Sequence, residues 1–311
     1  GRTKLLVAIA DVDVLVLAGS ACDDHARTNT TSVYTPAEIF PMLPERLSTD
    51  LTSLGEGHER LAMVVEMTVD AAGEVVGADI YRALVRNQAR LTYNAVGAWL
   101  IDEGPLPSHA AGIAGLGDVL RLQDEAAQGM RRRRHAHGAL TLDTLQSHPV
   151  FAGDAITDLR PDAKNRAKEL IEDLMIAANA ATAHTLERKG FAWIRRVLGA
   201  SRRWDRIVAL AATFGETLPN TPDAAALDAF LQSRRAADPL RFPDVSLSVV
   251  KMLGSGEYAV EPPGTVPSGH FGLAVTGYTH STAPNRRFPD LITQRLLKAA
   301  IAGAPPPYDR A

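Results

Sequence analysis

The sequence predicts an α+β fold: a mixed β-sheet packed with helices, with one long helix at its centre. Apolar residues alternate along Leu61–Val69, the pattern breaks at 70–73, and it resumes over Glu74–Val85, which is typical of a β-hairpin. A helical pattern extends from Ala163 to Lys189, and Gly190 follows at the position where glycine commonly ends a helix. These observations predict a sheet scaffold covered by a long helix.

The N-terminal apolar run Leu5–Leu17 predicts a buried strand. It is too short to span a bilayer, and Asp11 and Asp13 interrupt it, so we expect no membrane contact. We interpret Asp11 as a structural residue. A single cysteine, Cys22, excludes a disulfide framework and favours a reducing cytoplasm.

The composition is that of a globular chain without a general affinity for polyanions. Of the 311 residues 46% are hydrophobic, and the formal net charge of −3 gives a pI near 6.3. A protein that binds nucleic acid over its whole surface normally carries a basic excess, so any such site must be local. Cys/His spacing of the zinc type and Walker or Rossmann glycine patterns are absent from the sequence.

Further helices are expected over Ala110–Met130 and Leu291–Ile301, whereas 202–262 has a mixed helical and irregular pattern. The densest basic run, Arg131–Arg134, directly follows the first of these helices, with His135 and His137 after it. Such a run is usually a solvated helix end, and phosphate tracking is the alternative.

Polar donors crowd into the stretch 270–290. A strand predicted at Leu273–Val275 leads to a polar loop with Arg286 and Arg287, and Asp290 is placed to cap the following helix. Two adjacent guanidiniums beside a helix start can bind a phosphate, because the fork of arginine matches paired oxygens. A solvated arginine pair on a turn is the alternative.

The sequence of this stretch, HFGLAVTGYTHSTAPNRRFPD, resembles a signature region of the RNase II/RNase R (RNB) family. Two further blocks resemble the same family: LLVAIADV with TSVYTPAEIFPMLP, and the helix phrase LIEDLMIAANAA. The resemblance implies an RNB-like domain over 1–311, incomplete at both ends, with cold-shock and S1-type OB domains as neighbours. It implies a processive hydrolytic exoribonuclease that degrades single-stranded RNA from its 3′ end, releases nucleoside 5′-monophosphates and uses Mg²⁺.

The resemblance also assigns site residues. Two residues are expected to be catalytic: Arg286 matches an arginine that grips the phosphate at the cleavage site, and Glu172 matches a glutamate near the terminal nucleotide. Tyr34 matches a tyrosine that stacks on the 3′-terminal base, and Tyr93 matches one that favours ribose. The remaining expected RNA contacts are Arg287, His280 and Leu142. Leu142 stands where some members have a stacking phenylalanine, when HGALTL is aligned with the short strand before the long helix.

The family's metal-binding aspartate cluster would lie just before residue 1, so the resemblance leaves no metal ligand within this chain. We therefore expect these residues to bind RNA without cutting it, as a cytoplasmic monomer. Two hypotheses remain open: a fragment of an active exoribonuclease, or an RNB-like RNA-binding or regulatory paralogue that has lost hydrolysis.

Overall fold

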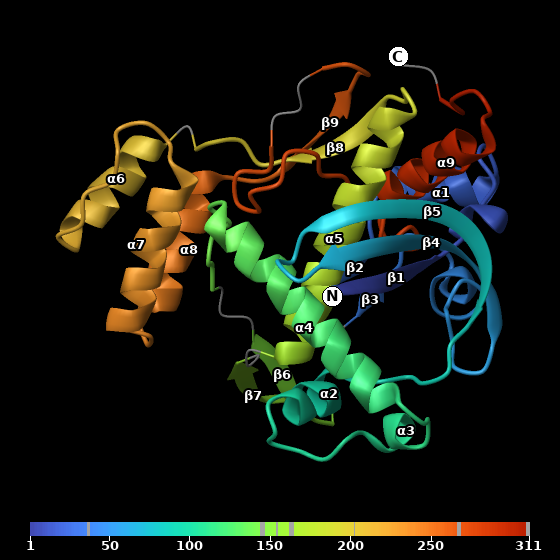
Figure 1. Cartoon of the computed structure of the whole chain (residues 1–311), viewed down its shortest axis with the longest axis horizontal. Helices are drawn as coiled ribbons and strands as arrows, with labels where there is room; N and C mark the ends of the chain where they lie inside the picture. Colours follow the sequence, from blue (N-terminus) through green and yellow to red (C-terminus); the bar gives the residue numbers. More distant parts are fainter. Residues whose placement is uncertain are drawn as a thin grey trace.

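The computed structural model describes residues 1–35, 38–143, 147–153, 155–161, 165–201, 203–265 and 269–308 (Figure 1). Helices and several small sheets form the α+β fold that the sequence predicts. The strands are β1 Arg2–Ala10, β2 Val33–Tyr34, β3 Ile39–Phe40, β4 Glu59–Asp70, β5 Val75–Arg86, β6 Ser147–Ala152, β7 Ala155–Pro161, β8 Trp193–Val197 and β9 Glu257–Glu261. The α-helices are α1 Ala21–Asn29, α2 Tyr93–Leu100, α3 Ser108–Ala111, α4 Leu116–Ala136, α5 Arg166–Arg188, α6 Trp204–Thr213, α7 Ala224–Ala237, α8 Phe242–Leu253 and α9 Phe288–Ala302. No described helix is long and apolar enough to cross a membrane.

The largest described sheet has the order β1-β4-β5, with antiparallel pairing throughout. The predicted hairpin is confirmed as β4 and β5. One face of the sheet forms the main core with the helices α5 and α9, which lie against it in Figure 1. Met67 on β4, Leu186 on α5 and Leu297 on α9 are all buried in this core. Burial of such side chains is worth about 1.5–3 kcal/mol each, so this contact fixes α5 on the sheet.

The central helix α5 ends where the sequence indicates but begins after Asn165, and its expected first residue, Ala163, lies outside the described residues. Asn165 is its N-cap, and its side-chain Oδ1 accepts from the amides of Ala167 and Lys168. Gly190 follows the C-cap with φ of 72°, a left-handed conformation that favours glycine. The predicted long helix is thus confirmed.

The helices α6, α7 and α8 form a separate helical unit at the left of Figure 1. The unit has its own hydrophobic core, which includes Trp204, Phe230 and Phe242. Leu140, which follows α4, is part of that core. Packing therefore joins the helical unit to the segment after α4, although β6, β7, α5 and β8 lie between them in the sequence.

Ion pairs fix the segment after β1 against α9. The Asp11 carboxylate is fully buried and contacts Arg82 Nε and Lys298 Nζ, each at 3.0 Å. Asp13 contacts Lys298 Nζ and Arg295 Nε, each at 2.7 Å. The arginine and lysine partners lower the pKa of Asp13 against the opposing effect of burial. These contacts support the structural role expected for Asp11.

Several local predictions were wrong. Leu273–Val275 forms no strand: the amides of Leu273 and Ala274 both donate to the His270 carbonyl at 3.0 Å, which makes a tight turn. Asp290 does not cap α9, whose N-cap is Arg287; it lies one turn into the helix and accepts the Ala283 amide at 2.8 Å.

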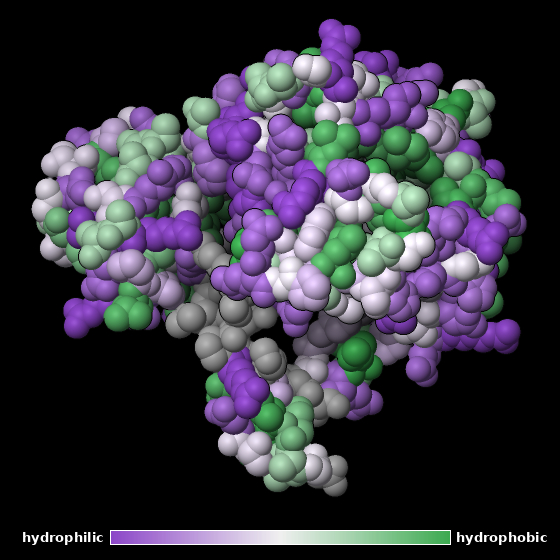
Figure 2. All heavy atoms as spheres, turned by 60° about the horizontal axis from the view of Figure 1, so that its bottom comes forward, coloured by the Kyte–Doolittle hydropathy of each residue, from purple (hydrophilic) through white to green (hydrophobic). Residues whose placement is uncertain are grey.

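The helix expected over Ala110–Met130 is broken between α3 and α4, where Gly115 adopts a φ of 77°. The segment 139–143 is not a strand either, and β6 and β7 intervene between it and α5. Figure 2 shows the arm to which β6 and β7 belong projecting from the body, and its exposed apolar side chains include Ile156 and Leu159.

Candidate RNA-binding site

The buried Asn179 side chain helps to fix the polar loop 278–282 to the middle of α5, where the Ser281 hydroxyl also lies 3.2 Å from Thr182 Oγ1. Asn179 is 2% exposed. Its Nδ2 donates to the Tyr278 hydroxyl at 3.2 Å, and its Oδ1 accepts from the Ser281 amide at 2.9 Å and the Ser281 hydroxyl at 2.8 Å. Because the amide group uses both of its ends, the loop has one well-defined position on the helix.

The two signature arginines have different environments. Arg287 donates from Nη2 to Asp290 Oδ1 at 2.7 Å, and the Asp290 side chain is fully buried. Burial raises the pKa of Asp290, while the Arg287 guanidinium opposes that shift. Arg286 is exposed, and its carbonyl accepts the Ser32 amide at 2.9 Å. Arg287 therefore has a structural partner, whereas Arg286 presents its guanidinium to solvent.

Backbone pairing places Tyr34 close to Arg286 in the fold. Residues 30–32 pair antiparallel with 286–288, through the Ser32 amide and through the Phe288 amide, which donates to the Thr30 carbonyl at 2.8 Å. Tyr34 follows two residues after Ser32, and its side chain is 59% exposed. Two predicted site residues that are far apart in sequence thus lie on adjoining segments.

His280 is held in a neutral form. Its Nδ1 lies 2.8 Å from the Tyr258 hydroxyl, and its ring meets those of Tyr258 and Tyr278 edge to face. Burial lowers the pKa of His280 to about 3, with the nearby Arg287 and Arg196 guanidiniums adding to the shift. At neutral pH His280 can exchange hydrogen bonds with a ligand but cannot attract a phosphate as a cation.

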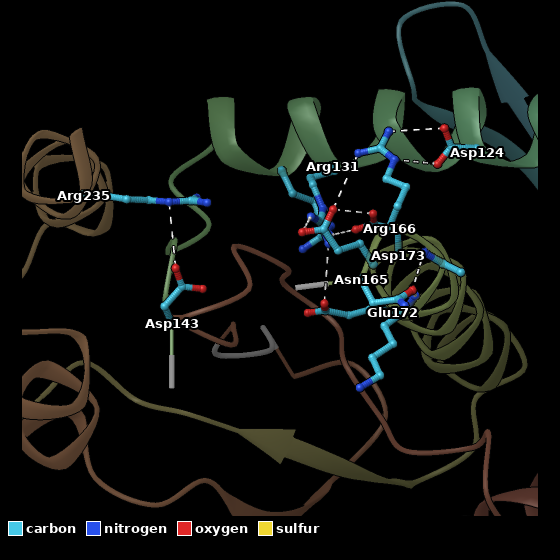
Figure 3. Close-up of polar contacts among 12 residues, drawn as sticks. Asp124, Arg131, Asp143, Asn165, Arg166, Glu172, Asp173 and Arg235 are labelled. Carbon is cyan, nitrogen blue, oxygen red and sulfur yellow. Dashed lines mark hydrogen bonds and ion pairs between the residues drawn. The ribbon is translucent and has the colours of Figure 1, made fainter. Parts of the chain in front are cut away.

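A cavity of about 920 Å³ lies between α4, α5, α7 and the segment 140–143 (Figure 3). Glu172 and Leu142, both predicted site residues, line it. Its charged lining contains five cations, which are Arg131, Arg132, Arg134, Lys168 and Arg235, and three carboxylates, which are Asp143, Glu169 and Glu172. The cavity is therefore positively charged in a chain whose net charge is negative.

Carboxylates on α5 hold two of these arginines. Arg131 pairs with Glu169 at 3.0 Å, with Asp173 at 3.0 Å and with Glu172 at 3.5 Å. Asp173 is 2% exposed and also pairs with Arg134. Burial raises the pKa of Asp173, and the two arginines oppose the rise.

This ion-pair network was not predicted from the sequence. The sequence does contain a pattern that indicates it: acidic residues at three- and four-residue spacing on α5 complement the basic run at the end of α4. The basic run is therefore neither wholly solvated nor wholly available to a ligand. Glu172 stays 57% exposed at the edge of the network, facing the cavity.

Tyr93 lies near the start of α5. It is the first residue of α2, and it is 48% exposed. The next residue, Asn94, accepts from the side chain of Asn165, which lines the cavity, at 3.3 Å. A Cβ on Gly97 would lie 2.5 Å from Asn165 Oδ1, so α2 can approach α5 this closely only with glycine there.

The predicted residues thus form two groups joined by α5. Glu172 and Leu142 line the cavity, whereas Tyr34, Arg286, Arg287 and His280 belong to the loop region that Asn179 anchors. Glu172 and Asn179 lie seven residues apart, which is about 10 Å along the helix and on nearly the same side of it. One helix therefore positions both groups.

Within the described part of the chain, no group of three or more His, Cys, Asp or Glu residues could hold a metal ion. The Mg²⁺ that the resemblance implies therefore has no matching ligand set among the described residues.

This α+β architecture, with one long helix at its centre, is that of an RNB domain. The RNB domain model matches residues 1–303, and the chain belongs to the RNB-domain family. Ribonuclease R of Escherichia coli strain K12 is 34% identical over 316 residues, which cover 97% of this chain and 36% of the relative. The chain therefore spans about a third of that relative's length.

Solved structures agree with this assignment. Mycoplasma genitalium RNase R in complex with ribose-methylated single-stranded RNA matches with a TM-score of 0.86 and 26% identity, covering 95% of this chain and 46% of that one. Yeast Ssd1, described as a pseudonuclease, matches with a TM-score of 0.76 and 19% identity, covering 99% and 37%. The second likeness shows that the fold also occurs in a protein described as lacking nuclease activity.

Proposed function

We propose that this chain holds the 3′ end of single-stranded RNA for a processive hydrolytic exoribonuclease of the RNB family, one that releases nucleoside 5′-monophosphates and depends on Mg²⁺. The observation that carries the proposal is the positively charged cavity containing Glu172 and Leu142. A polyanion gains most from cations gathered in a confined site, where the surrounding protein reduces screening. The positive charge of this cavity explains how a chain with a net negative charge can bind RNA.

The residues present have separable roles in this proposal. Arg286, exposed on a loop that is anchored to α5, binds a phosphate through its guanidinium fork. Tyr34, about half exposed, offers an aromatic face to a base of any identity, and Tyr93, also about half exposed, contacts a nucleotide near the cleavage site and favours ribose. Digestion without regard to sequence needs this combination of stacking and backbone contacts.

Glu172 has a different task. A carboxylate repels phosphates, but it accepts hydrogen bonds from hydroxyl groups, and RNA carries a 2′-hydroxyl that DNA lacks. The ion pair with Arg131, at 3.5 Å, partly neutralises the negative charge of Glu172 and so reduces its repulsion of phosphates. We assign Glu172 to the ribose of a terminal nucleotide, where it favours RNA over DNA.

The fold is equally compatible with an RNA-binding or regulatory protein that does not hydrolyse, as the likeness to yeast Ssd1 illustrates. Labelled oligoribonucleotide and oligodeoxyribonucleotide of one sequence distinguish the hypotheses when binding and monophosphate release are measured with and without Mg²⁺. Tighter binding of RNA than of DNA supports the proposed site. Metal-dependent release supports hydrolysis, whereas tight binding without release in the full-length protein favours the silent paralogue.

A further inference from the structure

The cavity has a second wall that belongs to the helical unit. Arg235 and Gln232 of α7 line it opposite α4 and α5. Figure 3 shows Arg235 extending toward Asp143, across the hollow from the cluster around Arg131. A ligand in the cavity would therefore lie between two different structural units.

The segment that forms the floor near Arg235 is fixed to the helical unit. The Thr141 amide donates to Asp228 Oδ1 on α7 at 2.6 Å, and the Asp143 amide donates to the Ser246 hydroxyl on α8 at 2.7 Å. Leu142 lies between these two anchors and packs against the core of the helical unit. Arg235 thus has a defined position beside a site residue.

Arg235 is also more available to a ligand than Arg131 and Arg134 of the other wall. Its Nε lies 3.8 Å from the nearer Asp143 oxygen, beyond hydrogen-bond distance, and its side chain is 44% exposed. Arg131 and Arg134 are 24% and 15% exposed and contact buried Asp173. The guanidinium of Arg235 can accordingly turn from its carboxylate to a phosphate without leaving a buried charge unpaired.

Building on the proposed function, we propose that Arg235 binds a phosphate of the RNA from the α7 wall. The helical unit then forms one wall of the RNA-binding cavity and contacts the RNA directly. The RNA strand is held between Arg235 on one side and the α4–α5 wall on the other, and Leu142 lies beneath the bases. Bidentate contact with two phosphate oxygens is the geometry that a guanidinium provides and an ammonium does not.

Salt dependence tests the proposal directly. Each phosphate neutralised on a single strand contributes about 0.7 to the slope of log affinity against log salt concentration. Fluorescence anisotropy with a labelled oligoribonucleotide, in a series of salt concentrations, gives that slope. We expect Arg235→Ala to reduce its magnitude by about 0.7. Arg235→Lys should keep the slope and bind more weakly than the unmodified protein.

Arg241→Ala is the matched control. Arg241 belongs to the same helical unit, is 86% exposed and has a distant ion pair at 4.0 Å, so the variant loses the same charge away from the cavity. Its slope should equal that of the unmodified protein. Equal slopes for Arg235→Ala and Arg241→Ala, in stably folded proteins that bind RNA, would overturn the role of Arg235. Failure of the unmodified protein to bind RNA in a salt-dependent way would overturn the proposed function itself.

Discussion

Asn179 on α5 and Ser281 in the signature loop make two hydrogen bonds to each other, from the Ser281 amide and from its hydroxyl to the same Asn179 oxygen. The residues are 102 positions apart in sequence. Their contact fixes the loop that carries Arg286 relative to the helix that carries Glu172. The distance between the phosphate-binding and ribose-binding groups therefore depends in part on one buried amide.

Replacing Asn179 with Ala should destabilise the fold. It leaves the Ser281 amide and the Tyr278 hydroxyl without their partner in a buried site, which costs about 2–4 kcal/mol in free energy of unfolding. Urea denaturation measures the loss, and hydrogen exchange of the 278–282 amides should accelerate. Thr185→Val is the control, because the Thr185 hydroxyl donates only within its own helix, to the Ala181 carbonyl. Comparable losses in both variants would contradict the anchoring role.

Replacing each of the two signature arginines with Ala should change the free energy of unfolding by different amounts. Arg286→Ala removes an exposed side chain and should change the free energy of unfolding by about 0.5 kcal/mol or less. Arg287→Ala leaves the buried Asp290 carboxylate without its cation and should cost about 3 kcal/mol. In a preparation that hydrolyses RNA, Arg286→Ala should lower the rate roughly a hundredfold, as loss of one positioned donor does. A large loss of stability in Arg286→Ala would show that its role is structural.

Acid should weaken the fold through His280. Its pKa is lowered to about 3 in the folded protein, below the unfolded value of about 6.5. The unfolded state therefore binds the proton first, and stability that is complete above about pH 6.5 is lost as pH falls toward 3. Between pH 7.5 and pH 5, His280→Gln should lose less stability than the unmodified protein. Equal losses in the variant and the unmodified protein would contradict this contribution of His280.

Leu142 is the position where an aromatic ring should strengthen base contact. Stacking on an aromatic face is worth about 1–3 kcal/mol per base, more than an aliphatic side chain provides. Leu142→Phe should therefore slow dissociation of a short oligoribonucleotide. Because Leu142 also packs against the core of the helical unit, a lower melting temperature would reveal overpacking. Equal dissociation rates in equally stable proteins would show that residue 142 does not face the RNA.

The elements that could be predicted from the sequence are those with a strong local period or a local end signal. The hairpin of β4 and β5 follows from alternation, and the end of α5 follows from a glycine in the left-handed region. Resemblance to the RNB family supplied the site residues, and the structure brings Glu172 and Leu142 into one cavity.

The errors came from contacts that the local sequence does not contain. The apolar residues Leu273–Val275 look like a strand, yet the His270 carbonyl closes a turn across them. Asp290 has the chemistry of a helix cap, but its partners are the Ala283 amide and Arg287 in the packed fold. The network of Arg131 with acids on α5 joins residues about 40 apart, so neither helix reveals it alone.

The central claim is that RNA binds in the cavity between α4, α5 and α7. A second hollow, of about 640 Å³, is lined by later residues of α5 and carries Arg133 and Arg188, so two cations can be removed from each site for comparison. Affinity for a labelled single-stranded oligoribonucleotide would be measured for Arg132→Ala/Lys168→Ala in the first cavity and for Arg133→Ala/Arg188→Ala in the second. The account predicts at least about a tenfold loss for the first pair and little change for the second. An equal loss in both, or a larger loss in the second, would contradict it.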